Sequence, residues 1–163
     1  MRMTRSNRVQ STSAAIALAI VVLTAGSALA DGSSGHSLLR ANLMGSNPAP
    51  ASPAIAGVNP GVAAWVNGPS HVRVREDGRI TVEIRGLIIP ALGNNPIASV
   101  VATLVCDNMV TDFTEPFALS AAGDGSTSDV ISVPRYCNDP VVLIQPASRS
   151  VYIASAFGEA EDD

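Results

Sequence analysis

Four arginines alternate with apolar residues in the stretch VRVREDGRITVEIRGL, which runs from Val72 to Leu87. They are Arg73, Arg75, Arg79 and Arg85. A guanidinium can donate two parallel hydrogen bonds, so this candidate anion-binding face could hold a carboxylate, a sulfate or an acidic polysaccharide. Three carboxylates interleave with the arginines, which leaves the stretch a net charge of only +1. The pattern therefore favours the solvated side of a half-buried strand pair, where arginine also discourages edge-to-edge pairing.

Two cysteines, Cys106 and Cys137, are the only ones in the chain. A metal-binding or a redox-active pair is the alternative, and neither fits well, because no C-x-x-C motif is present and only two histidines, His36 and His71, could assist. An even number of cysteines in an exported protein indicates a disulfide. We expect one structural disulfide that joins the segment 97–106 to the segment leading into 140–146.

Other residue types that could do chemistry give weaker patterns. The stretch GDGSTSD places Asp124, Ser126, Ser128 and Asp129 as oxygen ligands for Ca²⁺, but it lacks the EF-hand pattern and is more typical of a hairpin turn. Serine, histidine and aspartate are all present, yet neither a G-x-S-x-G nor an H-E-x-x-H motif accompanies them. The single tryptophan, Trp65, is expected to pack in the core. We expect no catalytic residue, no metal and no cofactor.

The first thirty residues predict a cleaved secretory signal peptide. Three arginines precede a nearly unbroken apolar run at 14–25, and Ala28-Leu29-Ala30 forms a small-residue cleavage site. The run is short for a membrane-spanning helix, so an uncleaved anchor is the less favoured alternative. Cleavage leaves 133 residues in a secreted or extracytoplasmic chain with no membrane insertion, which suits one domain with its own core.

The charge balance of the exported chain excludes some partners. Residues 31–163 hold seven arginines, no lysine and fourteen acidic residues, a net charge of −7. Such a chain will not bind nucleic acid or anionic lipid through bulk charge. Four of the acids fall within residues 159–163, which we expect to form a solvated acidic tail.

Short apolar segments separated by Gly, Pro, Asn and Asp predict eight or nine strands and no helix. The expected strands lie in 36–44, 62–66, the two arms of 72–87, 97–106, 115–125, 128–134, 140–146 and 150–157. Segment 45–61 contains four prolines and is expected to be an irregular edge or a long loop. The nearly continuous apolar run at 97–106 predicts a strand that is central or covered on both faces. Strand spacing of this kind indicates an all-β, single antiparallel β-sandwich, for example an immunoglobulin-like one.

The register of the 72–87 hairpin can be predicted from its side chains. A two-residue loop would mix apolar and charged residues on each face. A three-residue loop at 76–78 instead pairs Val74 with Ile80 and Arg73 with Thr81, and makes one face wholly apolar. Gly78 then takes the left-handed position of a type I turn with a bulge.

A family resemblance covers about residues 40–90. RANLMGSNPAPASPAIAGVNPGVAAWV followed by VREDGRITVEIRGLIIP resembles the first half of a CHRD domain, an all-β family found in chordin and in secreted bacterial proteins. The resemblance implies an extracellular antiparallel β-sandwich. The family's histidine-containing motif after the Gly-Leu strand is missing, as is its GEIRGQL-like ending, so no ligand or metal role is implied for any residue.

Together these observations predict an exported, non-catalytic binding or structural module of the cell envelope or extracellular space. Its segments would be a signal peptide at 1–30, a leader strand with the Pro-rich segment at 31–61, the sandwich core at 62–158 and the acidic tail at 159–163. The expected partner is an extracellular protein or an acidic glycan. The alternatives are an unrecognised secreted enzyme or inhibitor, and a carrier of a small apolar ligand.

Overall fold

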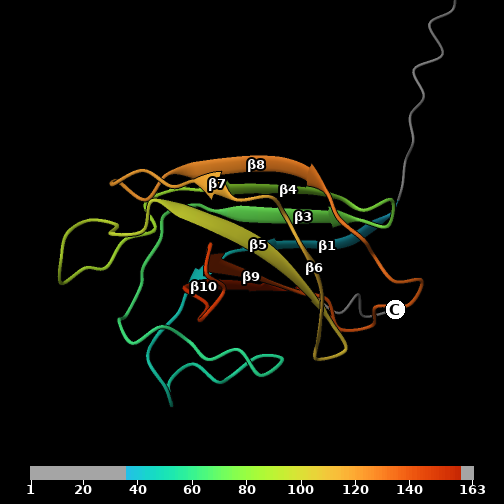
Figure 1. Cartoon of the computed structure of the whole chain (residues 1–163), viewed down its shortest axis with the longest axis horizontal. Helices are drawn as coiled ribbons and strands as arrows, with labels where there is room; N and C mark the ends of the chain where they lie inside the picture. Colours follow the sequence, from blue (N-terminus) through green and yellow to red (C-terminus); the bar gives the residue numbers. More distant parts are fainter. Residues whose placement is uncertain (1–35, 159–163) are drawn as a thin grey trace, which may run out of the picture. The chain divides into compact units, whose positions relative to one another are not determined.

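The structure, a computed structural model, describes residues 36–158, and between these residues it contains ten strands and no helix. The strands form two sheets in which every pair of neighbours is antiparallel, so the chain is all-β (Figure 1). The predicted signal peptide, the start of the leader and the acidic tail lie outside the described residues.

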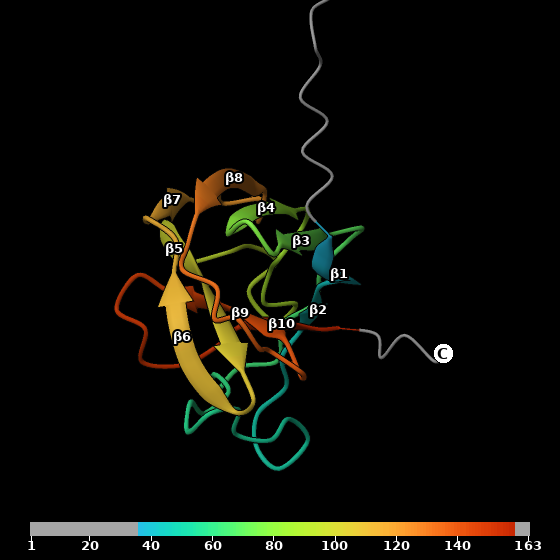
Figure 2. The same cartoon turned by 90° about the vertical axis from the view of Figure 1, so that its right-hand side faces the viewer.

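The first sheet, sheet A, has the strand order β1-β3-β4-β8. Its strands are β1 (Ser37–Asn42), β3 (His71–Arg75), β4 (Arg79–Ile84) and β8 (Gly125–Val130). Strands β1 and β8 form its two edges. In Figure 2 β8, β4, β3 and β1 follow one another in this order, and β9 and β10 of the second sheet lie below them.

The second sheet, sheet B, has the order β2-β10-β9-β5-β6, and β7 pairs with β5 beside β6. Its strands are β2 (Met44–Gly45), β5 (Ser99–Cys106), β6 (Met109–Phe113), β7 (Phe117–Ala118), β9 (Val141–Pro146) and β10 (Ala154–Phe157). Between β6 and β7, the Thr114 N–H donates to the carbonyl of Ala102, and the Ala102 N–H donates to the Thr114 hydroxyl. Thr114 therefore satisfies both backbone groups of Ala102 at the position where the pairing of β5 passes from β6 to β7.

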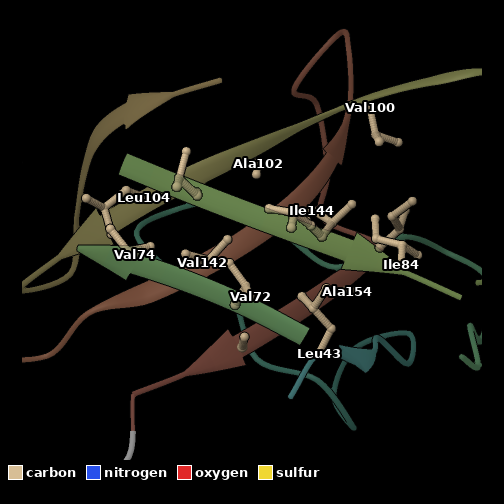
Figure 3. Close-up of a cluster of buried hydrophobic side chains, with 14 of the residues drawn as sticks. Leu43, Val72, Val74, Ile84, Val100, Ala102, Leu104, Val142, Ile144 and Ala154 are labelled. Carbon is tan, nitrogen blue, oxygen red and sulfur yellow. The ribbon is translucent and has the colours of Figure 1, made fainter. Parts of the chain in front are cut away.

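The core lies between the two sheets. Sheet A contributes the inward side chains of its central hairpin and sheet B those of β5 and β9 (Figure 3). They are Val72, Val74, Val82, Ile84, Val100, Ala102, Leu104, Val142 and Ile144. Each of them is 1% exposed or less, so their burial is the main source of stability for the sandwich. Trp65 packs in the same cluster, as predicted.

The Pro-rich segment covers the outer side of sheet B. Ile55, Ala56 and Val58 pack there in a second cluster, which includes Leu143 and Tyr152. The Tyr152 hydroxyl donates to the Pro53 carbonyl at 2.6 Å. Val105 of β5 belongs to the same cluster, and seven of the eight residues of β5 are buried, so this strand is covered on both faces.

The predicted hairpin register is confirmed. Val74 pairs with Ile80 and Arg73 with Thr81, and the Gly78 N–H donates to the Arg75 carbonyl. Gly78 has a φ of 86°, which is the left-handed conformation that the three-residue loop requires. A Cβ at this position would also collide with the Ile131 carbonyl oxygen, so glycine is needed here for two reasons.

The predicted disulfide is present between Cys106 and Cys137. Cys106 ends β5, and Cys137 lies in the connection from β8 to β9. The same connection is bound to β6, because the Ser132 N–H donates to an Asp112 carboxylate oxygen at 2.7 Å. The disulfide and this hydrogen bond therefore attach the connection to the hairpin of β5 and β6.

Five predicted strands differ from the structure. Segment 36–44 is divided between β1 and β2, which belong to different sheets, and within 150–157 only Ala154–Phe157 forms a strand. Segment 62–66 forms only an isolated bridge between Val66 and Ile88, with Val62 94% exposed. Within 115–125 only Phe117 and Ala118 form a strand before Gly125 begins β8. The strand expected at 128–134 instead covers 125–130, because β8 pairs with β4 along its whole length and the chain turns away after Val130.

Strand β6 was not predicted. It follows β5 through a two-residue turn in which Asp107 and Asn108 have φ values of 50° and 61°. Asp and Asn tolerate this conformation, so the dipeptide DN is itself a hairpin signal. The Asn108 side chain also accepts a hydrogen bond from the Ala56 N–H and so attaches the Pro-rich segment to this turn.

Candidate functional site

Five of the seven arginines between residues 36 and 158 lie on or beside sheet A, on its solvent-facing side. They form the arginine face: Arg40 on β1, Arg73 and Arg75 on β3, Arg79 on β4 and Arg85 just after β4. Alternation along the strands points the intervening valines and isoleucines into the core and the arginines outward. Four of the five are exposed and Arg75 is half-buried. The sequence-predicted arginines are thus brought to one surface.

The centre of the arginine face is a pair of opposed arginines. Arg40 lies directly opposite Arg73 in the β1–β3 register. The Leu43 N–H donates to the Ser70 carbonyl at 2.9 Å, and bonded pairs alternate with non-bonded pairs along antiparallel strands. Arg40 and Arg73 therefore form a non-hydrogen-bonded pair, in which Cα atoms are about 4.5 Å apart and side chains lie closest. Like charges opposed in this way destabilise a sheet.

The carboxylates of this face lie away from the opposed pair. Asp77 in the turn is 3.7 Å from the Arg75 guanidinium. At the other end, Glu83 binds the Arg85 guanidinium at 2.7 Å and lies 3.4 Å from the His71 ring. The hydrogen bond and charge of Arg85 lower the pKa of Glu83. Among residues 36–158, no carboxylate comes within ion-pair distance of Arg40, Arg73 or Arg79.

A solvent-open hollow of about 680 Å³ lies over the opposed arginines. Its polar lining comes from three strands: Arg40, Asn42, His71, Arg73 and Thr81. The strand registers extend this lining in a row across the sheet, from Arg40 through Arg73 and Thr81 to Ser128. Two cationic forks and two hydroxyls therefore face solvent in line, and they can donate hydrogen bonds to an anion or a sugar hydroxyl.

The candidate calcium ligands do not converge. Asp124 accepts a hydrogen bond from the Gly86 N–H at 2.9 Å, which attaches the turn before β8 to the chain just after β4. Ser126 and Ser128 point to solvent, while Asp129 points inward and accepts the Glu115 N–H at 2.8 Å. The stretch is mostly strand β8 rather than a turn, because it completes sheet A beside β4. An inward carboxylate on an edge strand also discourages further pairing.

The two histidines lie at opposite ends of β3. His71 begins β3 and faces Glu83. The His36 carbonyl accepts the Glu76 N–H, which places His36 beside the other end of the strand. The structure therefore does not bring the histidines together around one reacting atom.

Arg40 is the residue that sequence reasoning missed. It lies more than thirty positions before the hairpin, and only the pairing of β1 with β3 brings it opposite Arg73. Its outward position was readable from LLRAN, in which Leu39 is buried and Arg40 exposed. The pairing of β1 with β3 could not be predicted, because two strands that are distant in the sequence share no local pattern.

The described residues show neither a metal-ligand cluster nor a membrane-spanning helix. Among residues 36–158, no group of three or more His, Cys, Asp or Glu side chains is placed to hold a metal ion. None of these residues forms a helix long and apolar enough to cross a membrane. Comparison with protein-family models, curated proteins and solved structures gives no match. The resemblance of residues 40–90 to CHRD domains therefore stays a prediction.

Proposed function

We propose that this protein is an exported, non-catalytic module that binds an acidic polysaccharide on its arginine face. The observation that carries the proposal is the pair Arg40 and Arg73, opposed on neighbouring strands with no carboxylate of the described residues to neutralise them. A bound carboxylate or sulfate would remove the repulsion of this pair and accept hydrogen bonds from both guanidinium groups.

The surroundings of the pair favour a polysaccharide over a protein. Stable protein interfaces centre on buried aromatic or aliphatic anchors. The lining of the hollow instead offers arginine, asparagine, histidine and threonine side chains, and the large exposed apolar residue on β8, Val130, lies at the sheet edge. Thr81 and Ser128 add hydroxyl groups in line with the arginines, which suits a ligand that alternates charges and hydroxyls.

Export is supported by two independent features. The N-terminal sequence has the charged, apolar and small-residue regions of a secretory signal. The disulfide between Cys106 and Cys137 is a type of bond that persists in oxidising compartments. An acidic polysaccharide of the cell envelope or extracellular space is accessible to a protein in that location.

The test is retention of the oxidised chain 31–163 on immobilised polygalacturonate, with neutral dextran as the blank matrix. Arg40→Glu with Arg73→Glu should reduce the affinity at least tenfold, because hydrogen bonds to charged groups contribute about 1.5–3 kcal/mol each before the discount for exposure. The control away from sheet A is Arg149→Glu, whose side chain lies over the Phe113 ring of β6. The single variant Arg73→Glu makes the same charge change on the arginine face.

Equal retention of the wild type and of the Arg40/Arg73 variant would refute the proposal, as would an equal loss in the control variant. Soluble poly-glutamate serves as a carboxylate polymer without sugar hydroxyls. Retention on poly-glutamate but not on polygalacturonate would instead make an acidic protein the partner. Fluorescence of the buried Trp65 verifies that each variant is folded.

A further inference from the structure

His71 lines the same hollow as the two opposed arginines, Arg40 and Arg73. Alternation along β3 turns His71 and Arg73 to the same side of sheet A, and the pairing of β1 with β3 places Asn42 opposite His71. The His71 side chain is 56% exposed. A ligand bound to the opposed arginines can therefore also reach the imidazole ring.

Glu83 determines which ring nitrogen of His71 is left for a ligand. The two residues are partners in the β3–β4 register, and the His71 Nε2 atom lies 3.4 Å from the Glu83 Oε2 atom. In a neutral imidazole one nitrogen carries a hydrogen and the other is an acceptor. The carboxylate favours the hydrogen on Nε2, because Nε2 can then donate to it. Nδ1 is thus an acceptor in the neutral ring, and an anion has nothing to bind there.

Arg85 holds Glu83 in place and keeps it charged. The Arg85 Nε and Nη2 atoms donate to the Glu83 Oε1 atom at 3.0 Å and 2.7 Å, so Oε2 is the oxygen that faces His71. The hydrogen bond from Arg85 lowers the pKa of Glu83. Glu83 is therefore ionised throughout the range from about pH 5 to pH 8, in which histidine ordinarily changes charge. Of these three side chains, only the imidazole can gain or lose a proton in that range.

The charges around this group make the protonation of His71 matter to the hollow. His71, Glu83 and Arg85 together have no net charge when the ring is neutral and a charge of +1 when it is protonated. Arg40 and Arg73 lie two positions further along their strands from Asn42 and His71 and add positive charge. Ser126 of β8, which pairs with Glu83, is uncharged, and Asp124 accepts the Gly86 N–H just beyond Arg85.

We infer that His71 is a third ligand-binding side chain of the arginine face and that it binds an anion only when its ring is protonated. Protonation turns Nδ1 into a donor while Nε2 still donates to Glu83, and it adds a positive charge beside the opposed arginines. The face should therefore hold an acidic polysaccharide more tightly as the pH falls from about 8 to about 5. The ligand in this inference rests on the proposed function, whereas the orientation of the ring does not.

The first test is retention of the chain 31–163 on immobilised dextran sulfate, with neutral dextran as the blank. The sulfate groups of this polymer stay charged at both pH values, so a pH dependence belongs to the protein. Exposed ion pairs are modest in energy, so the affinity should be about two- to fivefold higher at about pH 5.5 than at about pH 7.5. His71→Gln should abolish this difference, because glutamine does not titrate.

Two further variants control this test. His36→Gln removes the other histidine, at the opposite end of β3, and should keep the wild-type pH dependence. His71→Arg has a permanent charge and should bind at about pH 7.5 at least as tightly as the wild type does at about pH 5.5. A wild type that binds equally at both pH values would overturn the inference, as would a pH dependence that survives in His71→Gln or is lost in His36→Gln.

The second test needs no ligand. The ¹⁵N chemical shifts of the imidazole show which nitrogen carries the hydrogen in the neutral ring. At about pH 8 the hydrogen of His71 should be on Nε2, because this atom faces the Glu83 carboxylate. A hydrogen on Nδ1 would contradict the inference, since the neutral ring could then already donate to an anion.

The outcomes separate the inference from the proposed function. Retention that depends on Arg40 and Arg73 but is the same at both pH values would support the function and refute the role of His71. Absence of retention at both pH values would refute the function and, with it, the binding role of His71, whatever the ¹⁵N shifts show.

Discussion

Reduction of the disulfide should cost the sandwich about 4 kcal/mol of its free energy of unfolding. Cys106 and Cys137 are 31 residues apart, and closing a loop of that length removes about 12 cal/mol/K of chain entropy from the unfolded state, or about 3.7 kcal/mol at 25 °C. Reduction leaves every side chain in place, so no cavity contributes to the difference. At a slope of about 2 kcal/mol/M, the urea midpoint should fall by about 2 M.

The measurement is urea unfolding of the chain 31–163 with and without a reductant, followed by the fluorescence of Trp65. This tryptophan is 5% exposed, so its emission reports on the core. The double variant Cys106→Ala with Cys137→Ala is the control and should not respond to the reductant. A loss below about 1 kcal/mol would refute the reasoning, because the connection from β8 to β9 would then be constrained in the unfolded chain by something other than the disulfide.

Three further predictions concern single contacts, and each is measured by urea unfolding. Asp112→Ala should cost about 1–2 kcal/mol at pH 7, because the carboxylate accepts the Ser132 and Phe113 N–H groups; Asp139→Ala is the control. These bonds lower the pKa of Asp112 below its ordinary value of 3.8, so its contribution is complete above that pH and is lost as the pH falls through the lower folded-state pKa. Gly78→Ala should cost at least about 1 kcal/mol more than Gly93→Ala: both have a positive φ, but only a Cβ at Gly78 meets neighbouring backbone. Tyr152→Phe should cost about 1 kcal/mol, since it leaves the Pro53 carbonyl without the phenol donor; an unchanged midpoint would show that water replaces that donor.

The parts of the fold that could be predicted are those that depend on the side-chain pattern of a single strand, of two consecutive strands, or on residue counts. The register of β3 with β4 followed from the alternation along both arms of the hairpin and from the length of its loop, and the structure agrees. The two-sided burial of β5 followed from its nearly continuous apolar run. The disulfide followed from the number of cysteines and the predicted export.

The parts that could not be predicted depend on contacts between distant segments. Strand β8 has serine, threonine and aspartate where a strand usually has apolar residues, because it is an edge strand that only β4 supports. Within segment 62–66 only Trp65 is buried in the core, and the backbone joins no sheet. Arg40 became part of the candidate site only through the pairing of β1 with β3.

The contrast between the two sheets bears on where a ligand can bind. The outer side of sheet B is covered by the chain itself, since the Pro-rich segment packs on Leu143 and Tyr152. The outer side of sheet A has no such cover among the described residues, and its strands alternate buried and exposed positions. Continuous apolar strands therefore belong to the sheet that the protein covers internally, and alternating strands to the sheet that it presents to solvent. The arginines lie on the alternating strands, so the positive charge of an otherwise acidic chain is concentrated on the sheet surface that remains open to a partner.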